Sequence, residues 1–292
     1  MAKAILKEKL QRGEFFYAPG AHDMIAATMA GRHGFDALYA SGYWLTASAY
    51  GLPDAGIATF TQMLDRVATL VKTAGDSAVI ADADTGYGGL LNMHHTVRGY
   101  EDAGVTAIQI EDQVFPKKCG HTPNRRVIPA EEMATKVRVA VDARRDPNFL
   151  IIARTDSLEA EGFEAALERA AIYGDAGADI VFVEAMTTVE QMREACSRLK
   201  KPLLANMAHG GKTPILSTKD LAEVGFAGAI FPSMSALAAA AAVDRAYAEM
   251  KTVGEASPEK VPLFDFREFC SLIGFEEVWA FERKWADFES GE

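Results

Sequence analysis

Eight short and nearly continuous apolar segments recur along the chain, and a stretch with a helical pattern separates each from the next. Such segments are typical of parallel strands that are buried on both faces. Eight units of this kind within about 250 residues match the size of a (β/α)8 barrel of the TIM type. A doubly wound open sheet is the alternative, but no Gly-x-Gly-x-x-Gly turn follows the first segment. The segments cover residues 15–18, 37–40, 78–81, 107–110, 149–153, 180–183, 202–205 and 228–231.

The segments predict an α/β fold in which residues 1–251 form the barrel and residues 252–292 form a linker and a C-terminal helical arm. The linker contains Gly254 and Pro258, and the arm carries many large apolar side chains. So many apolar groups would be costly on an exposed tail. We expect the arm to pack on the barrel or on a neighbouring subunit, which favours an oligomer. The side chains are those of Phe266, Phe269, Leu272, Ile273, Trp279, Phe281, Trp285 and Phe288.

The stretches between the apolar segments predict the outer helices. Thr59 suits the N-cap of a helix over residues 59–72. The strand over residues 37–40 ends at Ser41-Gly42, and we expect a long loop that runs through residues 51–56, which contain Gly51, Pro53 and Gly56. The other helices are expected over residues 23–33, 92–103, 130–144, 163–176, 189–199 and 218–224.

Composition limits the possible partners. The net charge of -11 makes an extended basic surface for nucleic acid unexpected. Cys119, Cys196 and Cys270 lie far apart and are odd in number, which favours a reducing compartment, and we expect a cytoplasmic location. No apolar run approaches the ~20 residues that cross a bilayer, so we expect no membrane association.

Polar side chains follow most of the predicted strands at the point where each strand ends. Because the carboxyl ends of barrel strands form one rim, we expect these side chains to lie together. A single acid after a strand is more often a helix cap, but capping does not explain so many at one rim. The residues are Ser41, Gly42, Asp82, Asp84, Glu111, Arg154, Glu184, Asn206 and Pro232 with Ser233.

Three of these residues predict a metal site. Asp82, Asp84 and Glu111 come from adjacent strands and would repel one another unless a cation lay among them. Mg²⁺ fits, because it accepts a few carboxylates and keeps water and substrate oxygens as its other ligands; Mn²⁺ is a possible substitute. Zinc is disfavoured, since no His or Cys lies at ligand spacing from another.

The sequence Lys-Lys-Cys-Gly-His at 117–121 predicts a catalytic loop. A lone cysteine is commonly a small buried apolar group. Here Lys117, Lys118 and His121 surround Cys119 with polar neighbours, and prolines bracket the segment. We therefore interpret Cys119 as a catalytic acid beside the metal.

Two further features suit an anionic substrate. Arg154 offers a planar fork for a carboxylate. Asn206, with Gly210 and Gly211 in the turn that follows, can supply more donors, although a plain loop explains the two glycines equally well.

Six motifs lie between residues 41 and 156: Ser-Gly-Tyr at 41–43, Gly-Leu-Pro-Asp at 51–54, Asp-Ala-Asp-Thr-Gly-Tyr-Gly at 82–88, Ile-Glu-Asp-Gln at 110–113, Lys-Lys-Cys-Gly-His at 117–121 and Ala-Arg-Thr-Asp at 153–156. Together they resemble the isocitrate lyase and phosphoenolpyruvate mutase superfamily, over nearly the whole chain. The cysteine motif resembles the lyase branch, which includes the 2-methylisocitrate lyases and the 2,3-dimethylmalate lyases.

That resemblance implies a homotetramer whose C-terminal helices are exchanged between subunits. It also implies Mg²⁺ at Asp84, with Asp82 and Glu111 nearby, and a loop that carries Cys119 over the substrate. The implied reaction is a retro-aldol cleavage of a 2-hydroxy di- or tricarboxylate to a 2-oxo acid, such as pyruvate, and a carboxylate. Cys119 would then protonate the carbanion.

The resemblance also implies roles for other residues. These are Tyr39 and Asp54 near the hydroxyl and the metal waters, Ser41, Gly42 and Tyr43 against the 2-oxo acid portion, Arg154, Glu184 and Asn206 toward the other carboxylate, and Lys117 beside the acid. Two departures leave the exact substrate open. Tyr43 and Trp44 stand where the methylisocitrate lyases carry small residues, and residues 209–211 replace a segment of the Glu-Phe-Gly type.

Other functions remain open on the same scaffold. One is phosphonate chemistry like that of phosphoenolpyruvate mutase or carboxyphosphonoenolpyruvate mutase, which needs no cysteine acid. Another is hydrolysis or decarboxylation of oxaloacetate, and Pro232 counts against hydrolysis because the hydrolases are expected to carry a serine there. A binding barrel without enzymatic activity is the last alternative.

Overall fold

The computed structural model of the chain describes residues 2–255, 257 and 259–289. Residues 1, 256, 258 and 290–292 lie outside the described part, as does the side chain of Phe288. The chain divides into two compact units, residues 1–236 and residues 237–292, and we describe each by itself. The division expected from the sequence, after residue 251, remains a prediction.

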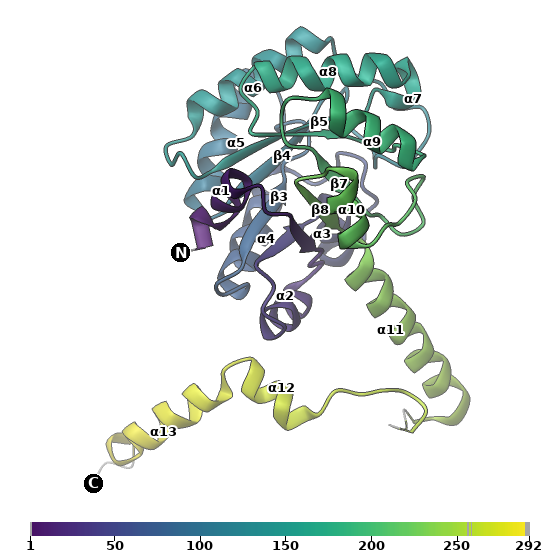
Figure 1. Cartoon of the computed structure of the whole chain (residues 1–292). Coiled ribbons are helices and arrows are strands. Elements are labelled where there is room, and N and C mark those ends of the chain that lie inside the picture. Colours follow the sequence, from purple (N-terminus) through teal and green to yellow (C-terminus); the bar gives the residue numbers. More distant parts are fainter. Residues whose placement is uncertain (1, 256, 258, 290–292) are drawn as a thin grey trace. The chain divides into compact units, whose positions relative to one another are not determined.

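The described residues contain eight strands, and every pairing between them is parallel. The strands are β1 (Phe16–Pro19), β2 (Ala37–Ala40), β3 (Ala78–Asp82), β4 (Ala107–Glu111), β5 (Leu150–Thr155), β6 (Ile180–Val183), β7 (Leu204–Asn206) and β8 (Gly228–Phe231). They pair in the order β2-β3-β4-β5-β6 and β1-β8-β7. Single bridges from Gly20 to Tyr39 and from Val181 to Leu203 join the two sets, so the ring closes as the expected barrel (Figure 1).

Helices follow the strands at most of the predicted positions. They are α1 (Ala2–Arg12), α2 (Met24–Arg32), α3 (Gly42–Tyr50), α4 (Phe60–Thr73), α5 (Leu90–Asp102), α6 (Ala130–Ala143), α7 (Leu158–Glu161), α8 (Phe163–Asp175), α9 (Val189–Arg198), α10 (Thr218–Val224), α11 (Met234–Val253), α12 (Phe266–Leu272) and α13 (Phe275–Glu289). The Thr59 side chain accepts a hydrogen bond from the Gln62 amide, and the Gln62 side chain accepts one from the Thr59 amide. This pair of bonds confirms Thr59 as the N-cap of α4.

The sequence predicted no helix between the strand end at Gly42 and the loop at residues 51–56, but α3 occupies Gly42–Tyr50. Its sequence is apolar or small throughout, without the stripe of helical period that marks an amphipathic helix. Leu45 and Thr46 of this helix are buried instead, and the Thr46 hydroxyl contacts the sulfur of Met63 in α4. The loop proper begins at Gly51, which ends α3 with a positive φ of 63°.

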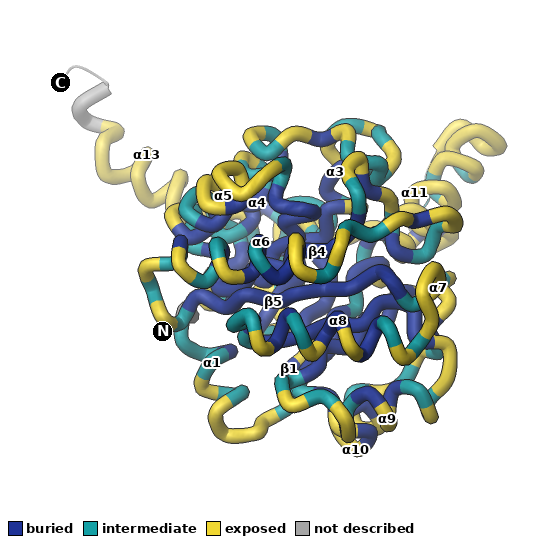
Figure 2. Tube along the Cα trace, turned by 90° about the horizontal axis from the view of Figure 1, so that it is seen from above, coloured by how far each residue is buried: buried dark blue, intermediate teal, exposed yellow. Residues whose placement is uncertain are grey.

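The core has an inner and an outer part because alternate residues of each strand face opposite sides. The inner cluster includes Ile80, Ile152 and Phe182, and the outer cluster packs the strands against the helices. Figure 2 shows the strands buried in the interior and the helices exposed on their outer sides. Leu6 of α1 belongs to the inner cluster, together with the first residues of several strands. The amino-terminal end of the barrel is therefore filled with apolar groups, which leaves the carboxyl end for polar chemistry.

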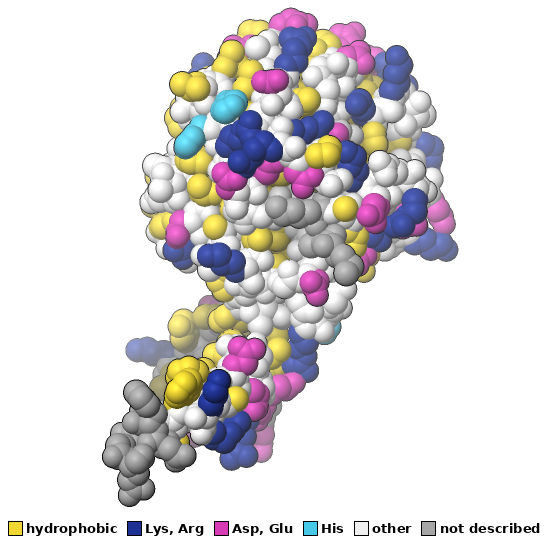
Figure 3. Space-filling model, turned by 90° about the vertical axis from the view of Figure 1, so that its left-hand side faces the viewer, with side chains coloured by type: hydrophobic (Ala, Val, Ile, Leu, Met, Phe, Trp, Pro, Cys, Tyr) yellow, Lys and Arg dark blue, Asp and Glu magenta, His cyan; other side chains and the backbone are white. Residues whose placement is uncertain are grey.

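The second unit contains two short helices after α11 where the sequence suggested one helical arm. Gly274, with a φ of 94°, separates α12 from α13. Many large side chains of this unit are exposed, among them Phe266, Ile273, Phe281 and Trp285. No helix in the described residues is both long and apolar enough to cross a bilayer. On the face drawn in Figure 3, basic and acidic side chains are interspersed.

Candidate active site

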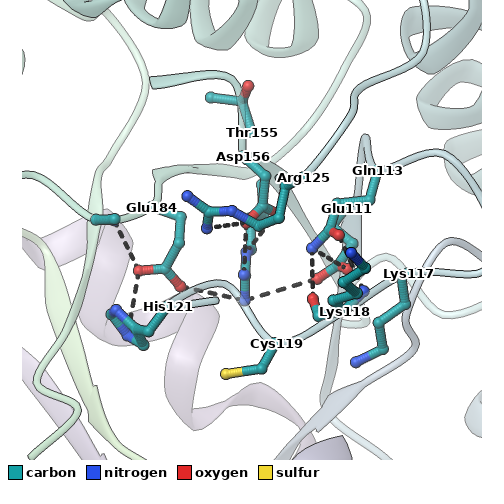
Figure 4. Close-up of polar contacts among 12 residues, drawn as sticks. Glu111, Gln113, Lys117, Lys118, Cys119, His121, Arg125, Thr155, Asp156 and Glu184 are labelled. Carbon is teal, nitrogen blue, oxygen red and sulfur yellow. Dashed lines mark hydrogen bonds and ion pairs between the residues drawn. The ribbon is translucent and has the colours of Figure 1, made fainter. Parts of the chain in front are cut away.

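The carboxyl ends of the strands bring the predicted polar residues to one end of the barrel. Asp82, Glu111 and Asn206 are the last residues of β3, β4 and β7. Arg154 lies one residue before the end of β5, and Glu184 directly follows β6. All five side chains are buried. Figure 4 shows Glu111 and Glu184 of this cluster together with residues of the cysteine loop.

The turn after β3 is shaped by its own carboxylates. Asp82 Oδ1 accepts from the Asp84 amide at 3.2 Å, and Asp82 Oδ2 accepts from the Gly42 amide at 3.2 Å. A Cβ atom at residue 42 would lie 2.9 Å from Asp82 Oδ2, so a larger residue would displace this carboxylate. Asp84 has a positive φ of 48°, an uncommon conformation that is frequent at functional sites.

Lys117 places its ammonium among the acids. Its Nζ lies 2.6 Å from Asp54 Oδ1 and 2.7 Å from Asp84 Oδ1, and its side chain is buried. Burial disfavours the charged form of Lys117, but Asp84 and Asp54 outweigh burial and raise its pKa well above the ordinary value. Burial raises the pKa of Asp84 to about 6, although Lys117 opposes this. The ammonium therefore lies where the sequence predicted a cation, beside Asp84.

Arg154 does not present its whole fork to the site, as the sequence suggested. Its Nε and Nη2 donate to the two oxygens of Asp156 at 2.9 and 2.8 Å. Only Nη1 faces the other acids, 3.2 Å from Glu184 Oε2 and 3.6 Å from Glu111 Oε2. Burial raises the pKa of Glu111 well above its ordinary value, against the opposing effect of Arg154. One guanidinium nitrogen thus faces the site, where it lies between the carboxylates of Glu184 and Glu111.

The cysteine loop, residues 114–127, lies over this cluster. It is held at its base by pairing of Gln113 with Val127. The Gln113 side chain bonds the amide and the carbonyl of Lys118 at 3.0 and 2.7 Å, and the Cys119 amide donates to the Asp54 carbonyl at 3.3 Å. Figure 4 shows the Cys119 side chain between Lys117 and Glu184.

The Cys119 thiol is half-buried. Burial raises its pKa, and the His121 backbone amide only partly opposes this. A thiol with a raised pKa stays protonated at neutral pH, so the group is set up as a proton donor rather than as a thiolate nucleophile. The lysines beside it in sequence do not change this, because Lys117 is engaged with Asp54 and Asp84.

The second half of the loop contacts the acids near β6. A Cβ atom at residue 120 would lie 2.0 Å from Arg154 Nη2 and 2.8 Å from Glu184 Cγ, so the glycine backbone lies directly on these side chains. His121 Nε2 lies 3.7 Å from Glu184 Oε1, and His121 Nδ1 accepts from the Lys212 amide at 3.4 Å. The Asn206 side chain donates to Glu184 Oε2 at 3.0 Å.

The remaining predicted residues differ in burial and in their distance from the acids of the site. Tyr39 is buried in β2 and donates to Gln109 Oε1 at 3.1 Å, and Ser41 is buried at the start of α3. Tyr43 is partly exposed and packs against Trp44. Three others were grouped with the site in the sequence. Of these, Gly211 lies against the His121 ring, Gly210 faces open space, and Pro232 lies against Gly20 where β1 meets β8.

Several buried residues at the site were not selected from the sequence as site residues. Gln113 fixes the cysteine loop, and Asp156 binds both Arg154 and Arg125. Asp112 accepts from the Asp156 amide at 2.8 Å. Gln113 and Asp156 stand within motifs that were noted, but a sequence does not show which of two adjacent polar residues points inward.

The residues at β3 and β4 fit Mg²⁺ in their chemistry. All three predicted ligands offer carboxylate oxygens, and the buried Asp84 Oδ1 already lies 2.7 Å from one cationic group, the ammonium of Lys117. Within the described residues, no three His, Cys, Asp or Glu side chains converge closely enough to form a complete metal site of their own. Mg²⁺ needs only one or two protein carboxylates, because it keeps water and substrate oxygens among its ligands.

Comparison with known proteins agrees with this arrangement. The phosphoenolpyruvate phosphomutase family matches residues 6–251. The 2,3-dimethylmalate lyase of Eubacterium barkeri is 42% identical over 283 residues, which cover 97% of this chain and 98% of the relative. The chain belongs to the phosphoenolpyruvate mutase/isocitrate lyase superfamily. The 2-methylisocitrate lyase of Aeropyrum pernix is also 42% identical, over 273 residues that cover 94% of this chain and 87% of the relative.

Solved structures of the superfamily share the whole fold. A crystal structure of 2,3-dimethylmalate lyase superposes with a TM-score of 0.91 at 35% identity and covers 97% of this chain and 94% of its own. Oxaloacetate acetylhydrolase with 3,3-difluorooxaloacetate gives a TM-score of 0.91 at 30% identity, with coverage of 98% and 97%. Phosphonopyruvate hydrolase, with a TM-score of 0.87 at 30% identity and coverage of 98% and 99%, was solved with oxalate and Mg²⁺. The superfamily therefore includes Mg²⁺-binding members that act on small carboxylates.

Proposed function

We propose that this protein is a Mg²⁺-dependent carbon-carbon lyase that cleaves a 2-hydroxy dicarboxylate or tricarboxylate of the 2,3-dimethylmalate or 2-methylisocitrate type. The products would be a 2-oxo acid, such as pyruvate, and a saturated carboxylate. The observation that carries the proposal is the placement of the Cys119 side chain, held by its loop beside the buried acids. Two curated relatives over nearly the whole chain are lyases of these two substrates.

The roles of the residues follow from their placement. Mg²⁺, held by Asp84 with Asp82 and Glu111 near it, would polarise the hydroxy-carboxylate end of the substrate. A base of the site, for which Tyr39 and Asp54 are the candidates, would take the proton of the substrate hydroxyl. Arg154 Nη1, which lies 3.2 Å from Glu184 Oε2 and 3.6 Å from Glu111 Oε2, would turn toward the other carboxylate of the substrate. When the carbon-carbon bond breaks, Cys119 would deliver its proton to the carbanion. The ammonium of Lys117 offsets the negative charges of Asp54 and Asp84 beside it.

The charge of the site favours a substrate with few negative charges. The site contains six carboxylates against three basic side chains, and all three guanidinium nitrogens of Arg154 already face acids. A tricarboxylate would add one more charge than a dicarboxylate and meets no additional free guanidinium among the described site residues. The carboxylates are those of Asp54, Asp82, Asp84, Glu111, Asp156 and Glu184, and the basic groups are those of Lys117, Arg125 and Arg154.

We therefore expect 2,3-dimethylmalate to be cleaved with a kcat/KM at least about tenfold above that of 2-methylisocitrate, which corresponds to about 1.4 kcal/mol. The measurement is release of 2-oxo acid, coupled to lactate dehydrogenase, with 2,3-dimethylmalate, 2-methylisocitrate, citramalate and isocitrate. The same preparation is tested with phosphonopyruvate by phosphorus NMR and with oxaloacetate. Turnover of phosphonopyruvate or oxaloacetate alone would assign the protein to another branch of the superfamily.

Removal of divalent cations is expected to abolish turnover. Without Mg²⁺ the developing charge on the substrate oxygens would meet only the acids of β3 and β4, and the loss should exceed about a hundredfold. Addition of Mg²⁺ should restore activity fully, and Mn²⁺ at least in part. Binding is checked separately by the rise in melting temperature when Mg²⁺ is added to the Asp84→Asn variant and to the unchanged protein. Full activity in excess chelator would refute the metal requirement.

The assembly proposed with this function is a homotetramer with exchanged C-terminal helices. The support is the number of large exposed side chains on α12 and α13, which exceeds what a solvated tail normally carries. Sedimentation at several protein concentrations is expected to give one species of about four subunits. A monomer at all concentrations would exclude the exchange.

A further inference from the structure

Asp156 is held rigidly at the end of β5. Its side chain and backbone are buried, and its amide donates to Asp112 Oδ1 at 2.8 Å. Asp112 Oδ2 in turn accepts from Thr155 Oγ1 and from Tyr173 Oη, both at 2.7 Å. With the amide and both neighbours fixed in this way, the carboxylate of Asp156 has little freedom to reorient.

Two arginines from different segments share this one carboxylate. Arg154 binds both oxygens through Nε and Nη2, and Arg125 Nη1 donates to Oδ1 at 3.1 Å. Burial alone would raise the pKa of Asp156, but Arg154 and Arg125 lower it below its ordinary value. The acid is therefore ionised, and the three side chains form one buried charge cluster in which each geometry depends on the others.

The cluster connects the substrate side of the barrel to the cysteine loop. Arg154 reaches the site through Nη1, whereas Arg125 belongs to the last part of the loop that carries Cys119. The loop also lies on Arg154 directly, because a Cβ atom at residue 120 would be 2.0 Å from Nη2. The backbone of Gly120 therefore lies against the same guanidinium group that Asp156 binds.

A second acid binds the outer side of Arg125. Glu159 of α7 accepts from Arg125 Nη2 at 2.8 Å and from Lys212 Nζ at 2.8 Å. Glu159 and Lys212 are each about 40% exposed, so water screens their pair, and it contributes little. Arg125 is 2% exposed, which makes its bond to Asp156 the one that matters.

We propose that Asp156 is a positioning residue that fixes the orientation of Arg154 and couples it to closure of the cysteine loop through Arg125. Arg154, which would bind the substrate carboxylate, and Cys119, the proton donor, are then positioned together. The effect on substrate rests on the proposed lyase function, whereas the coupling between loop and carboxylate does not.

The test compares Asp156→Asn, Arg125→Met and Arg125→Lys with Lys212→Met as the matched control. Amide hydrogen exchange of residues 117–122 is measured in the Mg²⁺-loaded protein without substrate. Asp156→Asn and Arg125→Met should exchange about tenfold faster in this segment, because local opening no longer breaks the buried pair. Arg125→Lys, which keeps a cation, should recover most of the protection, and Lys212→Met should stay within about threefold of the unchanged protein.

Kinetics with the best hydroxy acid supply the second measurement. Arg125→Met should lower kcat about a hundredfold with a small change in KM, since it releases the loop that carries the acid. Asp156→Asn should also raise KM at least about tenfold, because Arg154 loses its fixed orientation. A residue with a purely structural role would instead lower the melting temperature and the active fraction at unchanged KM.

Each outcome decides the proposal. Exchange and kcat/KM at the level of the unchanged protein in Arg125→Met would overturn the coupling, and so would failure of Arg125→Lys to restore more than Arg125→Met. Should Asp156→Asn fail to fold, the comparison of Arg125→Met with Arg125→Lys still tests the coupling. If the unchanged protein cleaves no hydroxy acid, the proposed function fails, while hydrogen exchange still tests the coupling.

Discussion

Replacing Cys119 with serine is expected to lower the rate of 2-oxo acid release by about a thousandfold, within the range of a lost general acid. The hydroxyl of serine is a far weaker acid than the thiol and cannot protonate the carbanion at a useful rate. The fold should not change, because the contacts of residue 119 that hold the loop come from its backbone. Its amide donates to the Asp54 carbonyl, and its carbonyl accepts from Thr122.

The measurement is kcat for 2-oxo acid release, with the melting temperature as the check on folding. The matched control is Cys196→Ser, which changes a half-buried cysteine of α9 and should keep nearly full activity. Since the proton donor acts in its protonated form, activity should fall as the pH rises through the raised thiol pKa. Full turnover in the Cys119→Ser variant would remove this residue from the chemistry.

The substitution Gly120→Ala is expected to lower kcat/KM by at least about a hundredfold, because misplacement of catalytic groups by about 1 Å costs this much. The methyl group would lie 2.0 Å from Arg154 Nη2 and 2.8 Å from Glu184 Cγ. Both neighbours are buried and fixed by other contacts, Arg154 by Asp156 and Glu184 by Asn206. The loop must therefore lift away, and it takes Cys119 with it.

Backbone strain does not confuse this test, since Gly120 is not among the glycines with positive φ. Gly89→Ala serves as the control, because Gly89 also has an ordinary φ of -79° and open space around its Cβ position. We expect near-normal kinetics for Gly89→Ala and a melting temperature for Gly120→Ala close to that of the unchanged protein. Equal kinetics in the two variants would show that the loop does not need this close contact.

Much of the barrel was predictable because its signals are local. A strand buried on both faces requires an unbroken apolar run, so the segments that became β2, β6 and β8 were located at their observed bounds. The N-cap at Thr59 could be predicted equally well, since Thr59 and Gln62, whose amide it binds, are only three residues apart. The helix α3 was missed because it carries no such local signal. It has no amphipathic period, and the packing of Leu45 and Thr46 comes from distant parts of the chain.

The residues of the candidate site could also be predicted, because the carboxyl ends of all strands in a closed parallel barrel lie at one rim. Asp82, Asp84 and Glu111 were selected on that ground, as were Glu184 and Asn206. The roles assigned to all of them stay predictions until the variants are measured.

The sequence by itself determined the ring of strands, the end of the ring that carries the chemistry and the loop that holds the thiol, because each follows from patterns within a few residues. Only the tertiary structure decided that the Arg154 fork belongs to Asp156, that Lys117 lies between Asp54 and Asp84, and that Gly120 rests on a guanidinium. The physical reason is that a charged side chain can satisfy itself with any of several partners. Which partner it takes depends on burial and on distances of a few tenths of an ångström between segments that are remote in sequence.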